Sequence, residues 1–428
     1  MRNTRSILVI GAGIAGLQAS LDLARSGLEV YLVERNPRIG GHTPLLHRVL
    51  PTLENAEELI KPLIEDVTKQ ENIRIIPYSE IATVEQGENT FDVTILKKPR
   101  YVDEEKCTLC GECEKVCPID VPKEYEKNLS ARKAVYFPSP YPIPQTYLID
   151  KEHCLYFLDG SCHACREACP ENAIVYGQKP EEERVDLDAI IVATGFKLYD
   201  VKRKGQYKYG VYRNVITGME YERLCNPEGP TNGKILRIDN LEKPKSVVYI
   251  LCVGSREEDN NEYCCRIGCL NALKHAYLLK DQYGAEADAH ICYTDIRAVG
   301  KNGESFYRRV RESEVNLIHG EPSEIRELPD KSLTIDVYDQ ATSRLLSINA
   351  DIIVLETGLE PETGLHRKLG VSLTQSGFFE ESHPQLARNE TSVKGVFLAG
   401  AVQEPMNIAE TMTNASAAAM KALILLRE

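Results

Sequence analysis

Residues 6–16 read Ser6-Ile7-Leu8-Val9-Ile10-Gly11-Ala12-Gly13-Ile14-Ala15-Gly16. The first five residues form the short, apolar, β-branched run that a buried parallel strand requires. The glycines that follow permit a tight turn and a close approach of the backbone to a pyrophosphate, which lies at the N-terminus of the next helix. The stretch therefore predicts the strand, turn and helix of a dinucleotide-binding unit. The expected ligand contacts are Gly11, Gly13, Ile14, Ala15 and Gly16.

A second strand follows and ends in an acidic residue. Glu29-Val30-Tyr31-Leu32-Val33 leads into Glu34-Arg35, at the distance from the glycines where a carboxylate meets a ribose hydroxyl. A glycine motif alone is a weak indicator. Strand, glycine turn, helix and acid in this order predict a dinucleotide site that includes Glu34 and Arg35.

Sequence further along favours FAD over NAD. Asn36-Pro37-Arg38-Ile39-Gly40-Gly41-His42 resembles the glycine pair that follows the acidic strand in flavoproteins with two dinucleotide-binding domains. The strands 188–195 and 395–401 lie where that superfamily returns to the flavin. The stretch Ile408–Leu426 lacks glycine and proline, which predicts a helix whose N-terminus faces the isoalloxazine. The added FAD contacts are Gly40, Gly41, His42, Ala193, Thr194, Gly195, Gly400, Ala401 and Ile408. His42 either tunes the ring or is a hydrogen-bonded loop residue.

Between residues 101 and 180, two runs of four cysteines each end in proline. The runs are Cys107-x2-Cys110-x2-Cys113-x3-Cys117-Pro118 and Cys154-x7-Cys162-x2-Cys165-x3-Cys169-Pro170. This pattern is typical of a ferredoxin with two 4Fe–4S clusters, in which the fourth cysteine of each run ligates the other cluster. The expected ligand sets are Cys107, Cys110, Cys113 with Cys169, and Cys154, Cys162, Cys165 with Cys117. Cys154 is the weak point, because its spacing to Cys162 is long.

Zinc and disulfides are the alternatives for these cysteines. Zinc knuckles use Cys-x2-Cys pairs but do not need two matching Cys-Pro endings. Disulfides need an oxidising compartment, and no secretory signal opens the sequence. Fourteen cysteines in such a chain favour metal ligation in a reducing cytoplasm.

Length and composition bound the remaining classes. A chain of 428 residues is too long for one core and predicts two or three domains. No apolar run approaches the ~20 residues that a membrane span needs. The net charge of −13 argues against sequence-independent nucleic-acid binding.

A second α/β unit is predicted after residue 240. Lys245–Leu251 reads as a strand, and Asp351–Gly358 echoes the strand 188–195. Relatives in the superfamily bind NAD(P)H at this unit. Here the turn Cys252-Val253-Gly254-Ser255-Arg256-Glu257-Glu258 has one glycine and two acids that would repel a pyrophosphate. We therefore expect the fold to persist without a nicotinamide nucleotide.

The predicted fold class is α/β, a two-dinucleotide-domain flavoprotein of the thioredoxin/glutathione-reductase type with an inserted two-cluster ferredoxin domain. Charged, proline-containing linkers, Lys97-Lys98-Pro99 and Gly177–Glu183, mark the insertion. The expected boundaries are 1–100 for the first part of the FAD-binding domain, 101–180 for the ferredoxin, 181–240 for the return strand and connector, 241–360 for the degenerate second Rossmann domain, and 361–428 for the last part of the FAD domain.

A third group of cysteines lies in the second α/β unit, as Cys252-x11-Cys264-Cys265-x3-Cys269. Vicinal cysteines are poor disulfide partners for one another. The interpretations that stay open are a third, unusual 4Fe–4S cluster, a redox-active disulfide, and buried free thiols. Cys225 and Cys292 stand alone and are expected to be packing residues.

Several short motifs outside the glycine and cysteine runs carry a family resemblance. They are Arg132–Tyr136, Gly254–Glu257, Asn261–Cys264, Tyr293–Arg297, Phe306–Arg309 and His383–Leu386. These motifs resemble the HdrA component of heterodisulfide reductase and its bacterial relatives. The resemblance implies an oxidoreductase component of a soluble multi-subunit complex, whose flavin exchanges electrons between partner subunits and ferredoxin-type clusters. It also implies that the flavin of some members bifurcates electrons. A homodimer is plausible for this chain by the same resemblance.

Some features depart from that family. Cysteines usual after the glycine pair are replaced by Pro51–Glu57, and the third cysteine group differs from the usual Cys-x3-Cys-Cys by Gly268 before Cys269. The chain ends at Glu428, without the further ferredoxin of the long archaeal forms, and so also resembles the QmoA component of quinone-interacting membrane-bound oxidoreductase. The alternative functions are a stand-alone NAD(P)H- or disulfide-dependent flavoprotein and a non-catalytic adaptor that wires neighbouring subunits.

Overall fold

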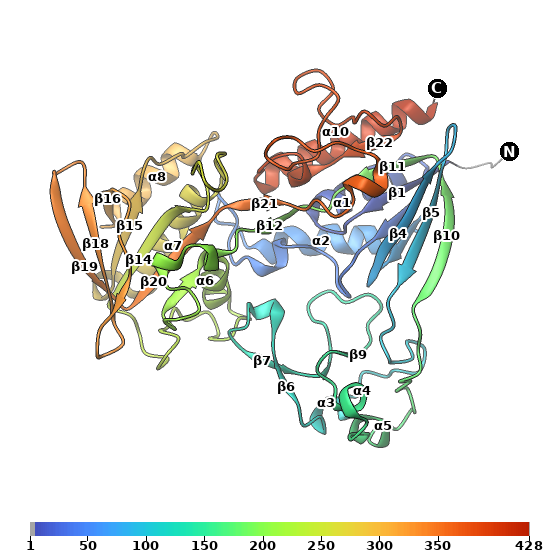
Figure 1. Ribbon diagram of the computed structural model, residues 1–428, viewed down its shortest axis with the longest axis horizontal. Helices are drawn as coiled ribbons and strands as arrows, with labels where there is room; N and C mark the ends of the chain where they lie inside the picture. The colour runs from blue at the N-terminus through green and yellow to red at the C-terminus, as the bar shows by residue number, and fades with distance from the viewer. Residues whose placement is uncertain (1–4, 428) are drawn as a thin grey trace.

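The computed structural model describes residues 5–427, so the outermost expected boundaries, 1 and 428, lie outside it. Figure 1 shows two α/β units side by side, with a small unit made of short elements below them. The chain forms the first α/β unit, leaves it for the small unit, returns, builds the second α/β unit and ends in the first.

The first unit is built on a five-stranded parallel sheet in the order β22-β11-β1-β2-β3. Its strands are β1 Ser6–Ile10, β2 Glu29–Val33, β3 Ile73–Ile76, β11 Ala189–Val192 and β22 Val396–Leu398. All five residues of β1 are buried, as predicted for a parallel strand covered on both faces.

Alternate residues of β1 face two different hydrophobic cores. Ile7 and Val9 pack with the helices α1 Ile14–Arg25, α2 Ala56–Lys69 and α10 Ile408–Arg427. Leu8 and Ile10 pack against an antiparallel sheet on the other face. That sheet consists of β4 Ser79–Gln86, β5 Phe91–Lys97 and β10 Glu181–Leu187. The helix predicted at 408–426 is confirmed as α10.

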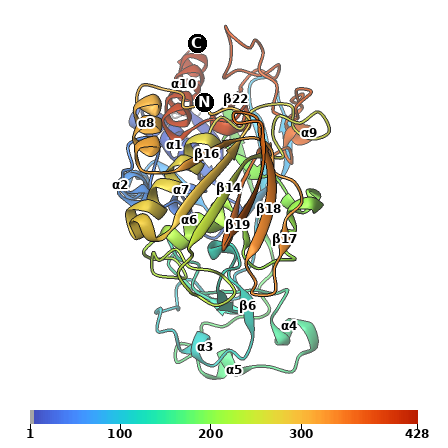
Figure 2. The same cartoon turned by 90° about the vertical axis from the view of Figure 1, so that its left-hand side faces the viewer.

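The second unit repeats this layered design. Its parallel sheet has the order β13-β20-β14-β15-β16, with strands β13 Val215–Thr217, β14 Ser246–Val253, β15 Asp288–Tyr293, β16 Asn316–His319 and β20 Ile352–Thr357. The helices packed in its core are α6 Gly218–Cys225, α7 Gly268–Tyr283 and α8 Gly303–Glu312. A small antiparallel sheet covers the other face, formed by β17 Arg326–Glu327, β18 Leu333–Asp339 and β19 Arg344–Ala350, and Figure 2 shows it at the front.

Two short strands join the α/β units. β12 Phe196–Leu198 leaves the first unit and pairs with β21 Leu359–Pro361, which returns to it. Within the stretch 181–240, expected to be return strand and connector, β13 and α6 belong to the second sheet and its core. The expected connector is therefore shorter than the sequence suggested.

The small unit, residues 98–180, is an insertion between two neighbouring strands, and we call it the insert. Lys97 at the end of β5 lies opposite Glu181 at the start of β10. The insert has its own small core, which contains Val135, Ile149 and Ile174. Its elements are α3 Glu112–Lys115, β6 Asp120–Pro122, β7 Ala131–Lys133, β8 Val135–Tyr136, β9 Leu148–Ile149, α4 Leu155–Asp159 and α5 Ala164–Glu167. Since its two ends meet at adjacent backbone positions, the insertion leaves the parent sheet intact.

Within residues 5–427, no helix combines the length and apolar character that crossing a membrane would require.

Candidate functional site

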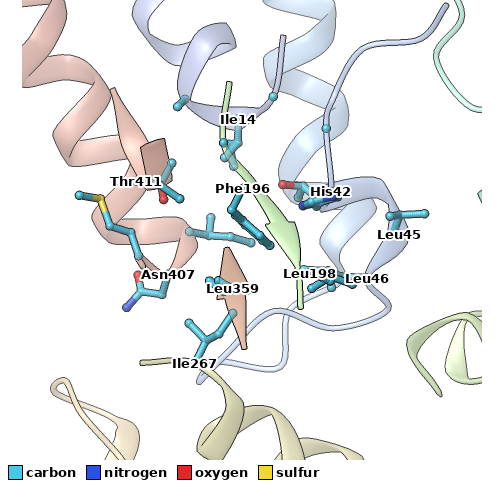
Figure 3. Close-up of a pocket in the computed structure, with 18 of the residues that line it drawn as sticks. Ile14, His42, Leu45, Leu46, Phe196, Leu198, Ile267, Leu359, Asn407 and Thr411 are labelled. Carbon is cyan, nitrogen blue, oxygen red and sulfur yellow. The ribbon is translucent and has the colours of Figure 1, made fainter. Parts of the chain in front are cut away.

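A cavity of about 1000 Å³ lies between the two α/β units. Figure 3 shows side chains from both units around it, including Ile14 of α1, His42, Phe196 of β12 and Ile267 before α7. Its volume stands at the upper end of the range for small-molecule sites, as an extended dinucleotide requires.

The glycine turn at one wall of this cavity is shaped for a phosphate. A Cβ on Gly16 would lie 1.8 Å from the carbonyl oxygen of Gly11, so only glycine lets α1 pack so closely on the turn. A Cβ on Gly13 would meet nothing nearer than Gly41 Cα at 3.8 Å, so it would project into space left open beside the turn. No side chain caps the N-terminus of α1. Its free N–H groups and helix dipole favour a bound anion.

Most of the residues predicted to contact FAD line this cavity. They are Gly11, Gly13, Ile14, Ala15, Glu34, Arg35, Gly41, His42, Ala193, Thr194, Gly195, Ala401 and Ile408. Gly16, Gly40 and Gly400 are not in the lining. Gly40 pairs with Gly13 as an isolated bridge, and a Cβ on Gly400 would lie 2.9 Å from Ala15 Cβ. These three glycines therefore permit close packing behind the wall.

Glu34 is buried at the end of β2 and holds the turn. One carboxylate oxygen accepts a hydrogen bond from the Ala12 amide at 2.8 Å, and the other accepts from the Asn36 backbone and side-chain amides, each at 2.8 Å. A carboxylate has room for about four hydrogen bonds. Glu34 can therefore accept one more, from a ribose hydroxyl in the cavity.

His42 is neutral at physiological pH. Desolvation in the cavity wall, followed by the positive charges of Lys127, Arg35 and Arg38, lowers the pKa of His42 to about 4. Its ring lies 4.7 Å from the ring of Phe196, and both are labelled in Figure 3. A neutral imidazole can donate one hydrogen bond and accept another without adding charge.

The second unit contributes a buried charge network that reaches the cavity. His275 is completely buried and lies 2.7 Å from both Glu222 and Glu356, through its two ring nitrogens. Lys274 also pairs with Glu222 and donates a hydrogen bond to the Arg48 carbonyl at 3.0 Å. Burial alone would lower the pKa of His275, but the two carboxylates raise it. Lys274 and Glu356 line the cavity, so the network forms part of its wall.

The eight cysteines of the insert fall into two sets. Each set lines one small cavity, and the two sets are Cys107, Cys110, Cys113 with Cys169, and Cys117 with Cys154, Cys162, Cys165. This is the crossed partition expected for a two-cluster ferredoxin. Cys154, which has the long spacing, lies with its expected set because α4 takes up part of the extra sequence.

Both sets surround a space and do not converge on a point. Within the described residues, no three or more His, Cys, Asp or Glu side chains are placed to hold a single metal ion. The cysteine sulfur of Cys165 lies 3.2 Å from the Tyr176 hydroxyl, and Cys169 accepts a hydrogen bond from the Ala173 amide at 3.3 Å. Hydrogen bonds to sulfur of this kind tune an iron–sulfur cluster.

The third cysteine group also comes together, at the end of β14 and the start of α7. Cys252 sits in the left-handed region with φ of 60°. Cys265 accepts a hydrogen bond from the Gly268 amide at 3.3 Å, and Cys269 donates to the Asp295 carbonyl at 3.7 Å. The hydrogen bond with Cys265 lowers the pKa of Cys264. Arg266, Ile267 and Gly268, between these cysteines, line the large cavity.

The turn after β14 differs from a phosphate-binding turn in shape as well as charge. A Cβ on Gly254 would lie 2.3 Å from the ring of Tyr199, so this glycine makes room for an aromatic ring. Glu257 pairs with Lys204, and its other oxygen accepts from the Gly254 amide at 3.3 Å. The helix α7 begins only at Gly268, after a long loop.

Several residues that line the cavity had no signal in the sequence. Lys127 of the insert and Lys274 are far apart in the chain and belong to no motif, and Glu356 belongs only to the predicted strand 351–358. Asn407 is different, because it precedes the predicted helix and its side chain accepts a hydrogen bond from the Glu410 amide at 2.9 Å, as a helix cap does. A capping pattern before Ile408 could have identified it.

Comparisons with known proteins agree with this geometry. The family model for pyridine nucleotide-disulphide oxidoreductases matches residues 5–112. Thioredoxin reductase from T. acidophilum superposes with a TM-score of 0.56 at 16% identity, covering 99% of this chain and 100% of that one. Thioredoxin reductase from Lactococcus lactis also gives 0.56, at 15% identity and 99% of each chain. At such identities the likeness concerns the fold alone.

Curated relatives are much closer in sequence. The iron–sulfur HdrA component of CoB–CoM heterodisulfide reductase from Methanocaldococcus jannaschii is 44% identical over 97% of this chain and 63% of its own length. The corresponding component of the H2:CoB–CoM heterodisulfide,ferredoxin reductase from Methanothermobacter marburgensis is 42% identical over the same shares. Fold and family model thus give the chain the fold class of the pyridine nucleotide-disulphide oxidoreductases. Within this class, the chain is homologous over nearly its whole length to the HdrA component of heterodisulfide reductase, which confirms the resemblance inferred from the motifs. The chain spans under two thirds of the length of these relatives.

Proposed function

We propose that this chain is the FAD- and iron–sulfur-containing electron-transfer component of a heterodisulfide-reductase-like complex. One observation carries the proposal. The eight cysteines of the insert form two four-cysteine cavities in the crossed arrangement of a two-cluster ferredoxin, on a chain that also has the dinucleotide cavity. The iron–sulfur designation of the relatives supports the same interpretation.

The residues of the large cavity fit FAD. The uncapped N-terminus of α1 and the open space beside Gly13 suit the pyrophosphate, and the spare lone pair of Glu34 suits a ribose hydroxyl. Asn407 and Ile408 at the N-terminus of α10 line the cavity, and the dipole of this helix would favour negative charge on a reduced ring. When bound, a flavin accepts electrons singly or in pairs, and so links two-electron to one-electron chemistry.

The insert fits two 4Fe–4S clusters, held by the two cysteine sets given above. Their sulfurs surround a space, whereas a zinc site needs four ligands directed at one ion. The insert would then be an inserted ferredoxin domain whose clusters carry single electrons to or from the flavin cavity.

A third cluster is proposed at Cys252, Cys264, Cys265 and Cys269. The four cysteines come from two pieces of chain, the end of β14 and residues 264–269, and lie near one another beside the cavity. Cys252 has a left-handed backbone conformation, which costs free energy in a residue other than glycine. A role as cluster ligand would explain why this conformation is kept. The alternatives stay a redox-active disulfide and free thiols.

Nicotinamide nucleotides are not the proposed electron source. The ring of Tyr199 fills the space above Gly254, and a long acidic loop separates β14 from α7. The ferredoxin and partner subunits then serve as the electron ports of the flavin. Rapid bleaching of the flavin by NADH or NADPH alone would instead favour the stand-alone reductase.

The relatives suggest the kind of complex. The Methanothermobacter marburgensis relative is named for both a heterodisulfide and ferredoxin, which are two different acceptors. By analogy, we propose that the flavin here divides electrons between two acceptors supplied by partner subunits, in a complex where this chain can also pair with a second copy of itself. A protein that is redox-active but turns over no small molecule with its partners would favour the wiring adaptor.

The decisive experiment is anaerobic purification of the full chain with flavin, iron and partner analysis. We expect one FAD and about eight irons per chain for two clusters, or about twelve with the third. Electron paramagnetic resonance should show reduced 4Fe–4S signals, and native pull-down should recover partner subunits. Less than one FAD, or clearly fewer than about eight irons, would overturn the proposal.

A further inference from the structure

One of the contacts that hold the insert against the two α/β units is a short turn, residues 124–127, which we call the docking turn. The Tyr125 hydroxyl donates a hydrogen bond to the Pro44 carbonyl at 2.6 Å. Two guanidinium groups lie over its ring, Arg38 at 4.4 Å and Arg223 at 4.7 Å. Arg223 also pairs with Glu126 at 2.8 Å, and both side chains are buried. The docking turn is therefore held by aromatic, ionic and hydrogen-bond contacts together.

The docking turn ends at Lys127, which lines the flavin cavity. Its backbone adopts the left-handed conformation, with φ of 53°. Within residues 5–427, its ammonium group forms no ion pair, although desolvation lowers its pKa from the ordinary value. A partly buried charge without a partner is costly unless a ligand supplies one.

Arg38 lines the same cavity and also lacks an ionic partner among the described residues. The carboxylates nearest to Arg38 and Lys127 accept hydrogen bonds from other groups. Glu124 forms a two-pronged pair with Arg132, and Glu34 accepts from the Ala12 and Asn36 amides. Glu220, the carboxylate near Lys127, accepts from Thr217 and Tyr209. Arg38 thus has only the Tyr125 ring against it, and neither cation forms an ion pair with a described residue.

Both cations line the cavity close to His42. Lys127 and Arg38 are near enough to His42 to lower its pKa, and His42 follows Gly41 directly. Gly41 lies against Gly13, the N-cap residue of α1. The third cation there, Arg35, is already paired with Glu362 at 2.8 Å. Two uncompensated positive charges and a helix N-terminus thus converge on one place, which favours a dianionic group.

We propose that Lys127 and Arg38 bind the pyrophosphate of FAD, so that the insert supplies part of the cofactor site of the first α/β unit. The inference rests on the proposed FAD site. Bound FAD in turn gives the docking turn its missing counter-charge, so the cofactor and the insert hold each other in place. The insert thereby couples its own position to the presence of the cofactor.

The test is a titration of FAD into anaerobically prepared, flavin-free full chain, followed by quenching of flavin fluorescence. We expect Lys127→Met and Arg38→Met each to weaken FAD binding by about tenfold or more. Added salt should weaken binding less in these variants than in the wild type. The control is Lys133→Met, which removes one charge from the same insert at a residue paired with Asp120 at 2.9 Å. Its affinity should stay within about twofold of wild type.

Iron content and circular dichroism show whether each variant has kept its fold. If Lys127→Met loses iron, Lys127→Arg should restore both iron and affinity, and Arg38→Met, outside the insert, gives an independent answer. Unchanged FAD affinity in both charge variants would overturn the inference. So would a shifted flavin midpoint potential without loss of affinity, because the charges would then face the ring. A wild-type chain that binds no FAD would overturn the proposed function itself, and this inference with it.

Discussion

Cys117 and Cys154 line the same cavity, although they belong to different cysteine runs. Cys117 is the last cysteine of the first run, and it lies with the first three cysteines of the second run. The equivalent exchange places Cys169 with Cys107. Neither set is complete without the other run, so the two halves of the insert are expected to depend on each other for cluster assembly.

Replacing Cys154 tests its place in the second set. We expect Cys154→Ser to lower the iron content by about four atoms per chain and to leave FAD bound. The control is Cys292→Ala, a buried cysteine of β15 outside every group, which should keep full iron. An iron content equal to wild type in Cys154→Ser would show that Cys154 is not a ligand.

The third cysteine group has its own signature. If it holds a cluster, Cys269→Ala should remove about four further irons without changing those of the insert. Because this group adjoins the flavin cavity, the flavin midpoint potential should shift as well. If the iron content of Cys269→Ala equals that of wild type, and thiol titration of the wild type finds no pair that oxidises to a disulfide, these cysteines are packing residues.

Gly13 offers a test of the flavin site that spares the fold. A Cβ there would meet no protein atom within 3.8 Å, so Gly13→Ala should fold normally. The added methyl group would occupy the phosphate cradle, and FAD affinity should fall by about ten- to a hundredfold. Gly177→Ala is the matched control, because a Cβ there meets nothing within 4 Å. Equal FAD affinity in both variants would contradict the assigned cradle.

His275 should make stability depend on pH. Its pKa is raised by Glu356 and Glu222, so the charged imidazole stabilises the folded state below its ordinary pKa of about 6.5. That contribution is lost as pH rises through the folded-state pKa. The thermal midpoint of the anaerobic protein should therefore fall between neutral and alkaline pH.

The variant His275→Gln removes that titration. Its thermal midpoint at pH 6 should lie about 3–6 °C below wild type, because breaking a buried pair costs about 3–5 kcal/mol and the unfolding entropy of so long a chain is large. It should also vary less with pH. His290→Gln is the comparison, since burial lowers the pKa of His290 and gives no loss of stability above neutrality. A wild-type profile that rises towards alkaline pH would refute the assigned charge state.

Glu126 tests the attachment of the insert. Glu126→Ala leaves Arg223 buried without its carboxylate and should cost about 3–5 kcal/mol of stability. Limited proteolysis should then cut the insert faster, and Glu126→Gln should restore part of the protection. Glu112→Ala, which breaks the half-exposed pair with Lys115, should cost less than about 1 kcal/mol. Equal proteolysis of all variants would show that this contact does not hold the insert.

The features that the sequence predicted are those with local causes. Strand β1, the glycine turn and α1 follow from adjacent residues, because packing at Gly16 leaves no room for a side chain. The two cysteine sets follow from spacing, because short loops determine which sulfurs can face one space. Even Cys154 could be assigned to its set, because the Cys-Pro endings of the two runs identify the other cysteines of each set.

Features made by distant residues could not be predicted. The network of Glu222, His275 and Glu356 joins α6, α7 and β20, and no spacing links them. Gly254 looked like the remnant of a phosphate turn, but the close approach of Tyr199 explains it better. Lys127 reaches the cavity only because the insert folds back onto the loop after β2.

The insert grows from one place on the parent sheet, where Lys97 faces Glu181. Two adjacent strands make a single stalk, and a body on one stalk can pivot. The docking turn acts as a latch against this pivoting, together with the backbone hydrogen bonds between residues 141–143 and residues 37–39. Since electron tunnelling weakens steeply with distance, the latch would set how fast charge moves between the proposed clusters of the insert and the proposed flavin. Opening it would slow electron transfer while leaving every cluster ligand in place.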